Sequence, residues 1–342
     1  PDHYRSDDCL WLFNAVPAYV KETGELDFFR IRLPYADHGE ATVFGHLRRA
    51  LEFNLERTGA HGLPCGLNAD WNDCIKLGEH GESVFVAFQL RFGLREYTEI
   101  SRLLHEPAET AWALAELVKL DKILEKSAWD GDWYLRAYRE DGQTFGSAKN
   151  TEGRIFMNPQ AWAVLSGHAT GDRARLSMEA MHRELATDYG IALCAPPYVT
   201  TDPSVAVARL FNPGMKENGG IFNHTQGWAV LAAVDLGWCN RAWEYMRNVM
   251  PASFNDKAEI RQVEPYVVCQ GTNSKFSPRY GAGRVPWLSG SAVWNYVAMT
   301  TGILGIKPRY DGLEISPCIP DEWPGFKATR RFRNCQFDIE VT

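Results

Sequence analysis

Residues 81–104 read GESVFVAFQLRFGLREYTEISRLL, a stretch in which apolar residues recur at spacings of three and four. That period places the apolar side chains on one face of a helix, and Glu82 and Ser83 are typical of a helix start. The same period recurs in six other segments, which are 9–21, 40–58, 107–129, 158–186, 224–250 and 288–304. The sequence therefore predicts a mainly α fold.

Long segments rich in glycine and proline separate these helices, namely 61–80, 188–222 and 262–287. Loops longer than about 15 residues in a compact domain are usually functional. Helix pairs joined by such loops predict an α/α toroid with its functional site at the loop end.

The hydrophobic period changes near residue 306. Four prolines punctuate short alternating runs, among them 313–315 and 337–341, and this alternation is typical of strands. We therefore expect a helical domain over residues 1–305 and the beginning of a small β module over 306–342.

Composition excludes several classes of protein. The 342 residues carry a formal net charge of −7, with no long basic segment and no apolar run of about 18 residues, so we expect neither a nucleic-acid partner nor a membrane span. The eight cysteines are scattered, which predicts reduced thiols in a cytoplasmic protein. The cysteines and nine histidines lack metal-ligand spacing, so we expect no metal site. Twelve Trp, thirteen Tyr and seventeen Phe are consistent with a carbohydrate ligand, whose ring faces stack on aromatic side chains.

The loop at 61–74 contains the stretch Asp70-Trp71-Asn72-Asp73. Glycoside cleavage requires an acid that protonates the leaving oxygen, and a tryptophan beside a carboxyl group both stacks on sugar and raises the pKa of the acid by desolvation. Asp and Asn also cap backbone amides in ordinary turns. Spacing alone leaves both interpretations open.

Two further segments could bind a polar ligand. Glu217 and His224 lie in a polar cluster that leads into a helix, although a histidine at a helix start is often structural. Ser289 and Gly290 precede another helix, whose free amides could bind phosphate; a plain helix cap is the alternative.

Together these segments resemble the cellobiose phosphorylase family, glycoside hydrolase family 94, which includes chitobiose, laminaribiose and cellobionic acid phosphorylases. The resemblance covers essentially the whole chain and is strongest at 62–84, 212–229, 264–296 and 310–320 with Trp323. It implies an (α/α)6 barrel, which could be incomplete at its N-terminal side here, followed by the start of a small β-sandwich module. It also implies inorganic phosphate as co-substrate and no cofactor.

The resemblance assigns roles to individual residues. Asp73 matches the proton donor, and Trp71 would lie against the sugar. Asp8 matches an acid that binds sugar hydroxyls, with Asp7 as an alternative. Glu217 and Gln270 match positions that bind sugar in the family. The positions that bind phosphate are matched by His224, Ser289 and Gly290.

These roles imply an inverting phosphorolysis of a β-linked disaccharide, with cellobiose as the first choice, to α-glucose 1-phosphate and free sugar. An inverting hydrolase needs a second carboxylate to activate water, whereas phosphate is already an anionic nucleophile. Such a hydrolase and a non-catalytic carbohydrate-binding fragment are the alternatives. The family's N-terminal β-sandwich is absent here, and homodimer contacts, common in relatives, are expected in that region.

Overall fold

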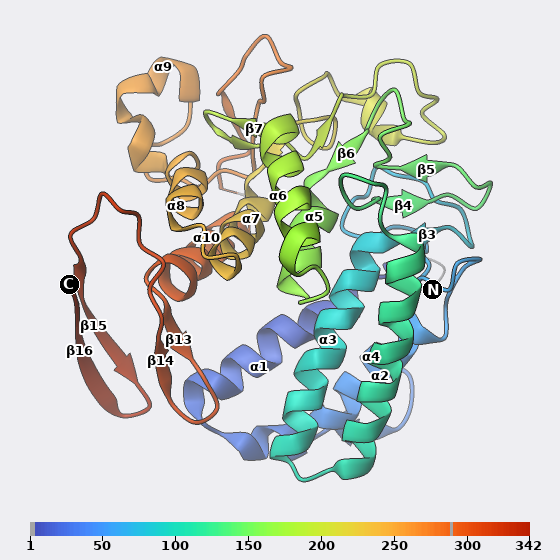
Figure 1. The fold of residues 1–342 in the computed structure, drawn as a ribbon, viewed down its shortest axis with the longest axis vertical. Coiled ribbons are helices and arrows are strands. Elements are labelled where there is room, and N and C mark those ends of the chain that lie inside the picture. Colours follow the sequence, from blue (N-terminus) through green and yellow to red (C-terminus); the bar gives the residue numbers. More distant parts are fainter. Residues whose placement is uncertain (1–3, 288–289) are drawn as a thin grey trace.

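The computed structural model describes residues 4–287 and 290–342, and helices dominate it (Figure 1). The α-helices of the described residues are α1 (Leu12–Thr23), α2 (Val43–Leu55), α3 (Val84–Leu103), α4 (Pro107–Ser127), α5 (Met157–Leu165), α6 (Gly171–Leu185), α7 (Asn223–Asp235), α8 (Cys239–Arg247), α9 (Ala258–Arg261) and α10 (Ser291–Val297). A π-helical segment, Ala298–Ile303, continues α10, and four short 3-10 helices are η1 (Asp8–Trp11), η2 (Leu26–Arg30), η3 (Val207–Leu210) and η4 (Pro251–Lys257). The prediction of a mainly helical fold is confirmed.

The strands are short and form small antiparallel sheets. Those before residue 306 are β1 (Arg32–Pro34) with β2 (Glu40–Thr42), β3 (Glu82–Ser83) with β4 (Ala137–Tyr138) and β5 (Thr144–Phe145), β6 (Ile155–Phe156) with β9 (Cys194–Ala195), β7 (Ala186–Thr187) with β8 (Gly190–Ile191), and β10 (Ile221–Phe222) with β11 (Gly271–Thr272) and β12 (Gly283–Arg284). Several of these sheets join loops that are distant in sequence, and they lie at one end of the helices (Figure 1).

Two of the expected long helices are each divided in the structure. Segment 158–186 forms α5 and α6, and segment 224–250 forms α7 and α8. Gly167 (φ +76°) and Gly237 (φ +69°) lie at the two breaks, because a left-handed residue ends an α-helix and glycine adopts that conformation without steric cost. The apolar period continues across both breaks, so the period alone does not reveal them.

Helix α3 begins where the sequence predicts. The Ser83 hydroxyl accepts a hydrogen bond from the Val86 amide at 3.2 Å, which satisfies one of the free N–H groups of the first turn. Along α3 most side chains are buried, including Phe85, Phe88 and Leu94.

The helices form an inner and an outer layer. Successive inner helices α1, α3, α5, α7 and α10 contact one another in that order, whereas α4, α6 and α8 each pack against the helix that precedes them in sequence. Nearly every residue of α5 is buried, but α4 and α8 are largely exposed on one side. The core lies between the inner helices, and their N-terminal ends face the long loops (Figure 1).

After residue 306 the chain forms two hairpins, β13 (Ile306–Pro308) with β14 (Leu313–Ile315) and β15 (Phe326–Phe332) with β16 (Cys335–Val341). Arg333 and Asn334 both have positive φ, as a two-residue type I′ turn requires. The Arg330 guanidinium pairs with Glu22 at 2.6 Å, which attaches this hairpin to α1.

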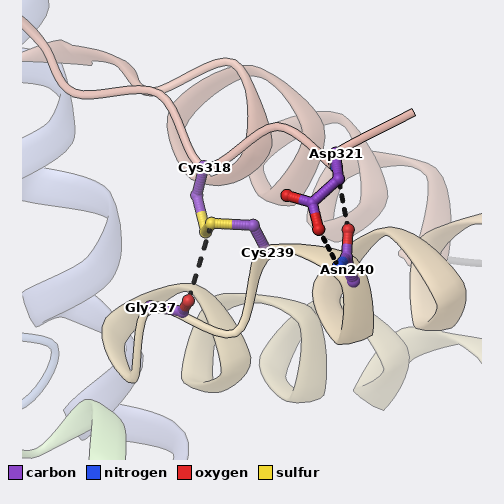
Figure 2. The surroundings of a disulfide bond; sticks show 5 residues. All are labelled: Gly237, Cys239, Asn240, Cys318 and Asp321. Atoms are coloured by element: carbon purple, nitrogen blue, oxygen red, sulfur yellow. Dashed lines mark hydrogen bonds between the residues drawn. A yellow bond between two sulfur atoms is a disulfide. The ribbon is translucent and has the colours of Figure 1, made fainter. Parts of the chain in front are cut away.

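A disulfide joins Cys239 at the start of α8 to Cys318 (Figure 2). Beside it, the Asn240 side chain donates to the Asp321 carboxylate at 2.8 Å. The expectation that every cysteine is a reduced thiol is therefore wrong for this pair, because spacing along the sequence does not show which cysteines meet in space. The fold brings these two together from positions 79 residues apart.

The helices give no indication of a transmembrane segment. Among the described residues, none combines the length and the apolar character needed to cross a bilayer.

The centre of the core predicts a large effect of one substitution. Trp162 is 1% exposed, and its ring contacts those of Trp11, Phe85, Phe92 and Trp228. Trp162→Ala should lower the free energy of unfolding by about 3–5 kcal/mol, because it removes buried apolar area and leaves a cavity. Phe337→Ala, at a ring that is 40% exposed, is the control. Equal losses in urea denaturation of the two variants would contradict this description of the core.

Candidate active site

A buried arginine organises the loop at residues 70–74. Arg136, immediately before β4, is fully buried, and its Nη2 donates to Asp70 Oδ1 at 2.6 Å. The other carboxylate oxygen of Asp70 accepts from the Ser83 hydroxyl at 2.7 Å, while Oδ1 also accepts from the Asn72 amide at 2.8 Å. Asp70 is therefore a structural ion-pair partner that ties the loop to the start of α3.

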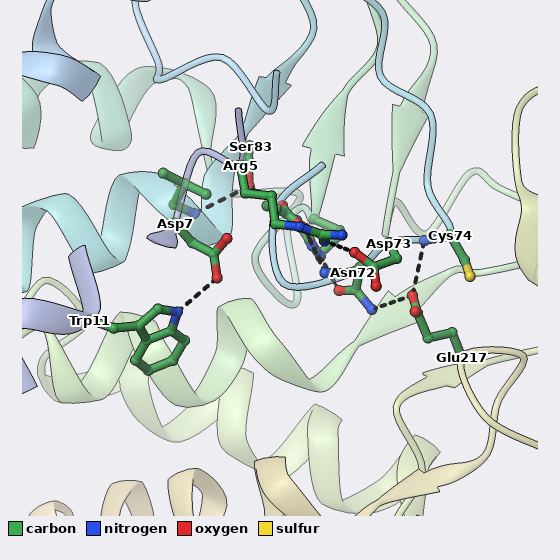
Figure 3. Close-up of polar contacts among 11 residues, drawn as sticks. Arg5, Asp7, Trp11, Asn72, Asp73, Cys74, Ser83 and Glu217 are labelled. Carbon is green, nitrogen blue, oxygen red and sulfur yellow. Dashed lines mark hydrogen bonds and ion pairs between the residues drawn. The ribbon is translucent and has the colours of Figure 1, made fainter. Parts of the chain in front are cut away.

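The same arginine fixes the orientation of the Asn72 side chain. Arg136 Nε and Nη2 donate to Asn72 Oδ1 at 3.1 and 2.7 Å. Because a guanidinium can only donate, the oxygen of the Asn72 amide must face it, and the NH2 group must point the other way. Asn72 Nδ2 then donates to Glu217 Oε2 at 3.1 Å (Figure 3).

Glu217 is held at the opposite side of the loop. Its Oε2 accepts from the Cys74 amide at 3.2 Å as well as from Asn72. Burial raises the pKa of the Glu217 carboxyl above its ordinary value, while these hydrogen bonds act in the opposite direction. The fold thus brings two segments that are 145 residues apart into direct contact.

Asp73 has a very different environment from Asp70. Its side chain is 56% exposed and forms an ion pair with Arg5, whose side chain is 41% exposed (Figure 3). Backbone bridges from Arg5 to Leu67 and Ala69 hold the N-terminal segment along the loop. Asp73 is therefore a solvent-accessible carboxyl group, and a ligand that contacts it must displace Arg5 from it.

Trp71 and His224 connect the loop to the start of α7. The Trp71 Nε1 donates to His224 Nδ1 at 3.1 Å, and the Trp71 ring contacts Phe222 and Trp228 with centroid distances of 5.2 and 5.5 Å. Burial lowers the pKa of His224 to about 4, so the ring is neutral at pH 7. Since an indole N–H can only donate, Nδ1 is the acceptor and the hydrogen of the neutral ring is on Nε2. His224 therefore offers an N–H donor.

The two acids near the N-terminus differ in exposure. Asp7 is 3% exposed and accepts from Trp11 Nε1 at 2.8 Å (Figure 3). Asp8, in contrast, is exposed at the start of η1. Burial, followed by the nearby charge of Asp70, raises the pKa of Asp7 to about 7. The geometry places Asp7, rather than Asp8, among the buried polar groups beside the loop.

The remaining predicted residues lie around the starts of α7 and α10. The Gln270 carbonyl accepts from the Asn223 amide at 2.9 Å, which places Gln270 next to His224 along the sheet. Gln270 also lines a cavity of about 130 Å³ with Lys216 and Arg284. Gly290 is the N-cap residue of α10, and Ser289 lies outside the described residues.

The structure identifies two site residues that sequence reasoning did not single out, Arg136 and Arg5. Arg136 lies in the mostly apolar run Trp133-Tyr134-Leu135-Arg136-Ala137, and a charge within such a run is a signal for a buried ion pair. Arg5 gives no comparable signal. Over residues 4–287 and 290–342, no three His, Cys, Asp or Glu side chains converge as a metal ion would require.

Comparison with solved structures defines the class of fold. Over 99% of this chain and 31% of its own, a GH78 family rhamnosidase of Bacillus sp. GL1 superposes with a TM-score of 0.66 at 13% identity. That similarity shows a helical fold shared with a glycosidase. The profile of the glycosyl hydrolase 94 superfamily catalytic domain matches residues 2–305, and the chain belongs to this family.

Phosphorylases from other organisms align with nearly all of this chain. An N,N'-diacetylchitobiose phosphorylase of Vibrio proteolyticus is 38% identical over 338 residues, which are 98% of this chain and 42% of the relative. A solabiose phosphorylase of Paenibacillus borealis is 34% identical over 343 residues, or 99% of this chain and 45% of the relative. The chain thus spans less than half the length of these relatives.

The buried position of Asp7 predicts a pH-dependent stability. Its pKa is about 7 in the folded chain against an ordinary value of 3.8, so folding favours the protonated form. The contribution of Asp7 to the free energy of unfolding should therefore fall as pH rises from about 4 to about 7. Asp7→Asn should remove this fall and be more stable than the wild type at pH 8 by about 2–4 kcal/mol.

Urea denaturation between pH 4 and pH 8 measures this difference, and Asp8→Asn is the matched control. Comparing variants cancels the opposite pH dependence that the buried His224 contributes. Parallel curves for Asp7→Asn and the wild type would show that Asp7 is ionised throughout.

Proposed function

We propose that this chain forms an (α/α)6-barrel catalytic domain over residues 1–305, with 306–342 as the beginning of a β module. We further propose that the domain carries out inverting phosphorolysis of a β-linked disaccharide. Inorganic phosphate is the co-substrate, and the products are α-glucose 1-phosphate and a free sugar. Membership of glycosyl hydrolase family 94 and the names of the relatives support this proposal.

One observation carries the proposal: the hydrogen bond from Trp71 to His224 joins the loop of an accessible acid to a neutral histidine with an N–H donor. An acid and an anion-binding donor within one site are the two groups that phosphorolysis requires. Asp73 is the accessible carboxyl group of that loop, since Asp70 is paired with Arg136. Glu217, which faces the loop from another segment, is hydrogen-bonded to Asn72 and Cys74.

In the proposed reaction, Asp73 donates its proton to the glycosidic oxygen as the bond from that oxygen to the sugar C1 breaks. A phosphate oxygen attacks C1 from the opposite face, so the β-glycoside becomes an α-sugar phosphate. Trp71 stacks on the sugar, and Glu217 and Gln270, with Asp8 or Asp7, accept or donate hydrogen bonds at its hydroxyls. His224, Gly290 and Ser289 hold the phosphate.

The identity of the disaccharide is part of the proposal. The family resemblance of residues 269–274 and their flanks makes cellobiose the first choice, and the names of the relatives add N,N'-diacetylchitobiose and solabiose to the candidates. The panel to be assayed therefore contains all three.

The decisive measurement is release of sugar 1-phosphate from each disaccharide, with and without phosphate. The wild type should release it only with phosphate, and Asp73→Asn should lower the rate by at least about 100-fold, as expected for loss of general acid catalysis. Asp37→Asn, at an exposed acid outside the site, is the control. Release of free glucose without phosphate would instead identify a hydrolase, and binding without turnover a non-catalytic fragment.

The assignment of His224 predicts a selective effect on phosphate. His224→Phe keeps an aromatic ring in place but removes the Nε2 donor together with the Nδ1 acceptor of Trp71, and one hydrogen bond to a charged group contributes about 1.5–3 kcal/mol. The KM for phosphate should therefore rise about 10- to 100-fold, and the KM for the disaccharide should rise less, because the sugar is affected only through the lost acceptor of Trp71. A larger change for the disaccharide would assign His224 to the sugar.

A further inference from the structure

Two aromatic side chains near the candidate site are unusually exposed. Tyr266 is 72% and Trp287 is 70% exposed, the highest values among the large hydrophobic side chains of the described residues. Their ring centroids lie 6.1 Å apart with an interplanar angle of 59°, so the two rings form an open angle and are not stacked on each other. Large aromatic rings are normally at least partly buried, and exposed ones often mark a binding surface.

The indole ring is held in place by a polar contact. Trp287 Nε1 donates to Glu264 Oε1 at 2.9 Å, so the orientation of the ring is set by a carboxylate from the neighbouring segment. The hydrogen bond uses only the edge of the ring, and the faces remain free for stacking. A carboxylate beside two exposed rings differs from a purely apolar patch, because it also offers hydrogen-bond acceptors.

Both aromatic residues extend from the small sheet that carries Gln270. The Gln270 amide donates to the Val285 carbonyl at 3.1 Å, and β11 pairs with β12 one residue further along. Tyr266 therefore precedes this sheet contact by four residues, and Trp287 follows it by two. At the other edge of this sheet, β10 ends two residues before His224, so the aromatic pair and His224 flank the same three-stranded sheet.

A cavity of about 400 Å³ adjoins Tyr266. Its polar lining comes from Glu264, Asn255 and Arg261, and its apolar lining includes Phe254 and Val267. A pyranose has apolar C–H faces and a rim of hydroxyl groups. The exposed rings match the faces, and the carboxylate and amide match the hydroxyls.

We propose that Glu264, Tyr266 and Trp287 form an additional carbohydrate subsite, which binds a sugar unit beyond the disaccharide in a β-linked oligosaccharide. The choice of carbohydrate rests on the proposed function. With this subsite, the protein binds oligosaccharides of three or more sugar units more tightly than disaccharides. Stacking on Trp287 and hydrogen bonds to Glu264 supply the extra affinity.

The test is calorimetric binding of cellobiose, cellotriose, cellotetraose and the corresponding N-acetylated chito-oligosaccharides without phosphate. In at least one series, the trisaccharide should bind the wild type about 5- to 10-fold more tightly than the disaccharide. Trp287→Ala and Tyr266→Ala should each remove most of this difference while changing the disaccharide affinity less than about twofold. Glu264→Gln retains an acceptor for the indole and should keep more of the difference than Glu264→Ala.

Tyr296→Ala is the matched control, since Tyr296 is an aromatic residue that is 69% exposed on α10 and lines a different hollow, beside α1. Equal affinity of the wild type for di- and trisaccharides, or an equal loss in Tyr296→Ala, would overturn the proposal. So would a wild-type dimer in sedimentation that Trp287→Ala dissociates, because the rings would then be a contact between copies of this chain.

Comparing wild-type phosphorolysis with the effect of Trp287→Ala on trisaccharide binding separates this inference from the proposed function. If the wild type shows no phosphorolysis but Trp287 still contributes to trisaccharide binding, the subsite stands and the proposed reaction fails. If the wild type shows phosphorolysis but the Trp287→Ala variant binds trisaccharides normally, the proposed reaction stands and the additional subsite fails.

Discussion

The buried guanidinium of Arg136 is the interaction on which the geometry of the candidate site depends. It is fully buried and donates to Asp70, Asn72 and Ser83, which belong to the loop and to the start of α3. A buried charge is tolerated only when it is paired and its hydrogen bonds are satisfied, and loss of one partner of such a pair costs about 3–5 kcal/mol. The loop therefore cannot move away from α3 without exposing an unpaired charge to an apolar interior.

A chain of hydrogen bonds connects Arg136 to the rest of the site. Arg136 orients the Asn72 amide, the Asn72 amide donates to Glu217, and the backbone of Cys74 donates to the same carboxylate oxygen. On the other side of the loop, Trp71 donates to His224. One loop thus contacts side chains from the residue before β4, from the start of α3 and from the start of α7, which are distant in sequence.

The environments of the carboxyl groups separate their roles. Asp70 is paired and buried, Glu217 is buried and hydrogen-bonded, and Asp73 is exposed beside Arg5. Groups of the same chemistry acquire different tasks through burial and neighbouring charges, as is usual at catalytic sites. The aromatic pair at Tyr266 and Trp287 flanks the small sheet that also leads to His224, so the proposed additional subsite and His224 share one supporting sheet.

The sequence by itself determined the helical character of the chain, because an apolar period of three to four residues is a local property, and the cap at Ser83 is one as well. It also pointed to the Asp70–Asp73 loop, since those residue types are recognisable side by side. Only the tertiary structure decided that Asp70 is buried against Arg136, that Asp73 meets Arg5, and that Cys239 is bonded to Cys318. The helix breaks at Gly167 and Gly237 are a different case, because the glycines are visible in the sequence although the apolar period does not change there. The physical reason is that burial and pairing depend on which distant segments meet, and no local pattern in the chain encodes those meetings.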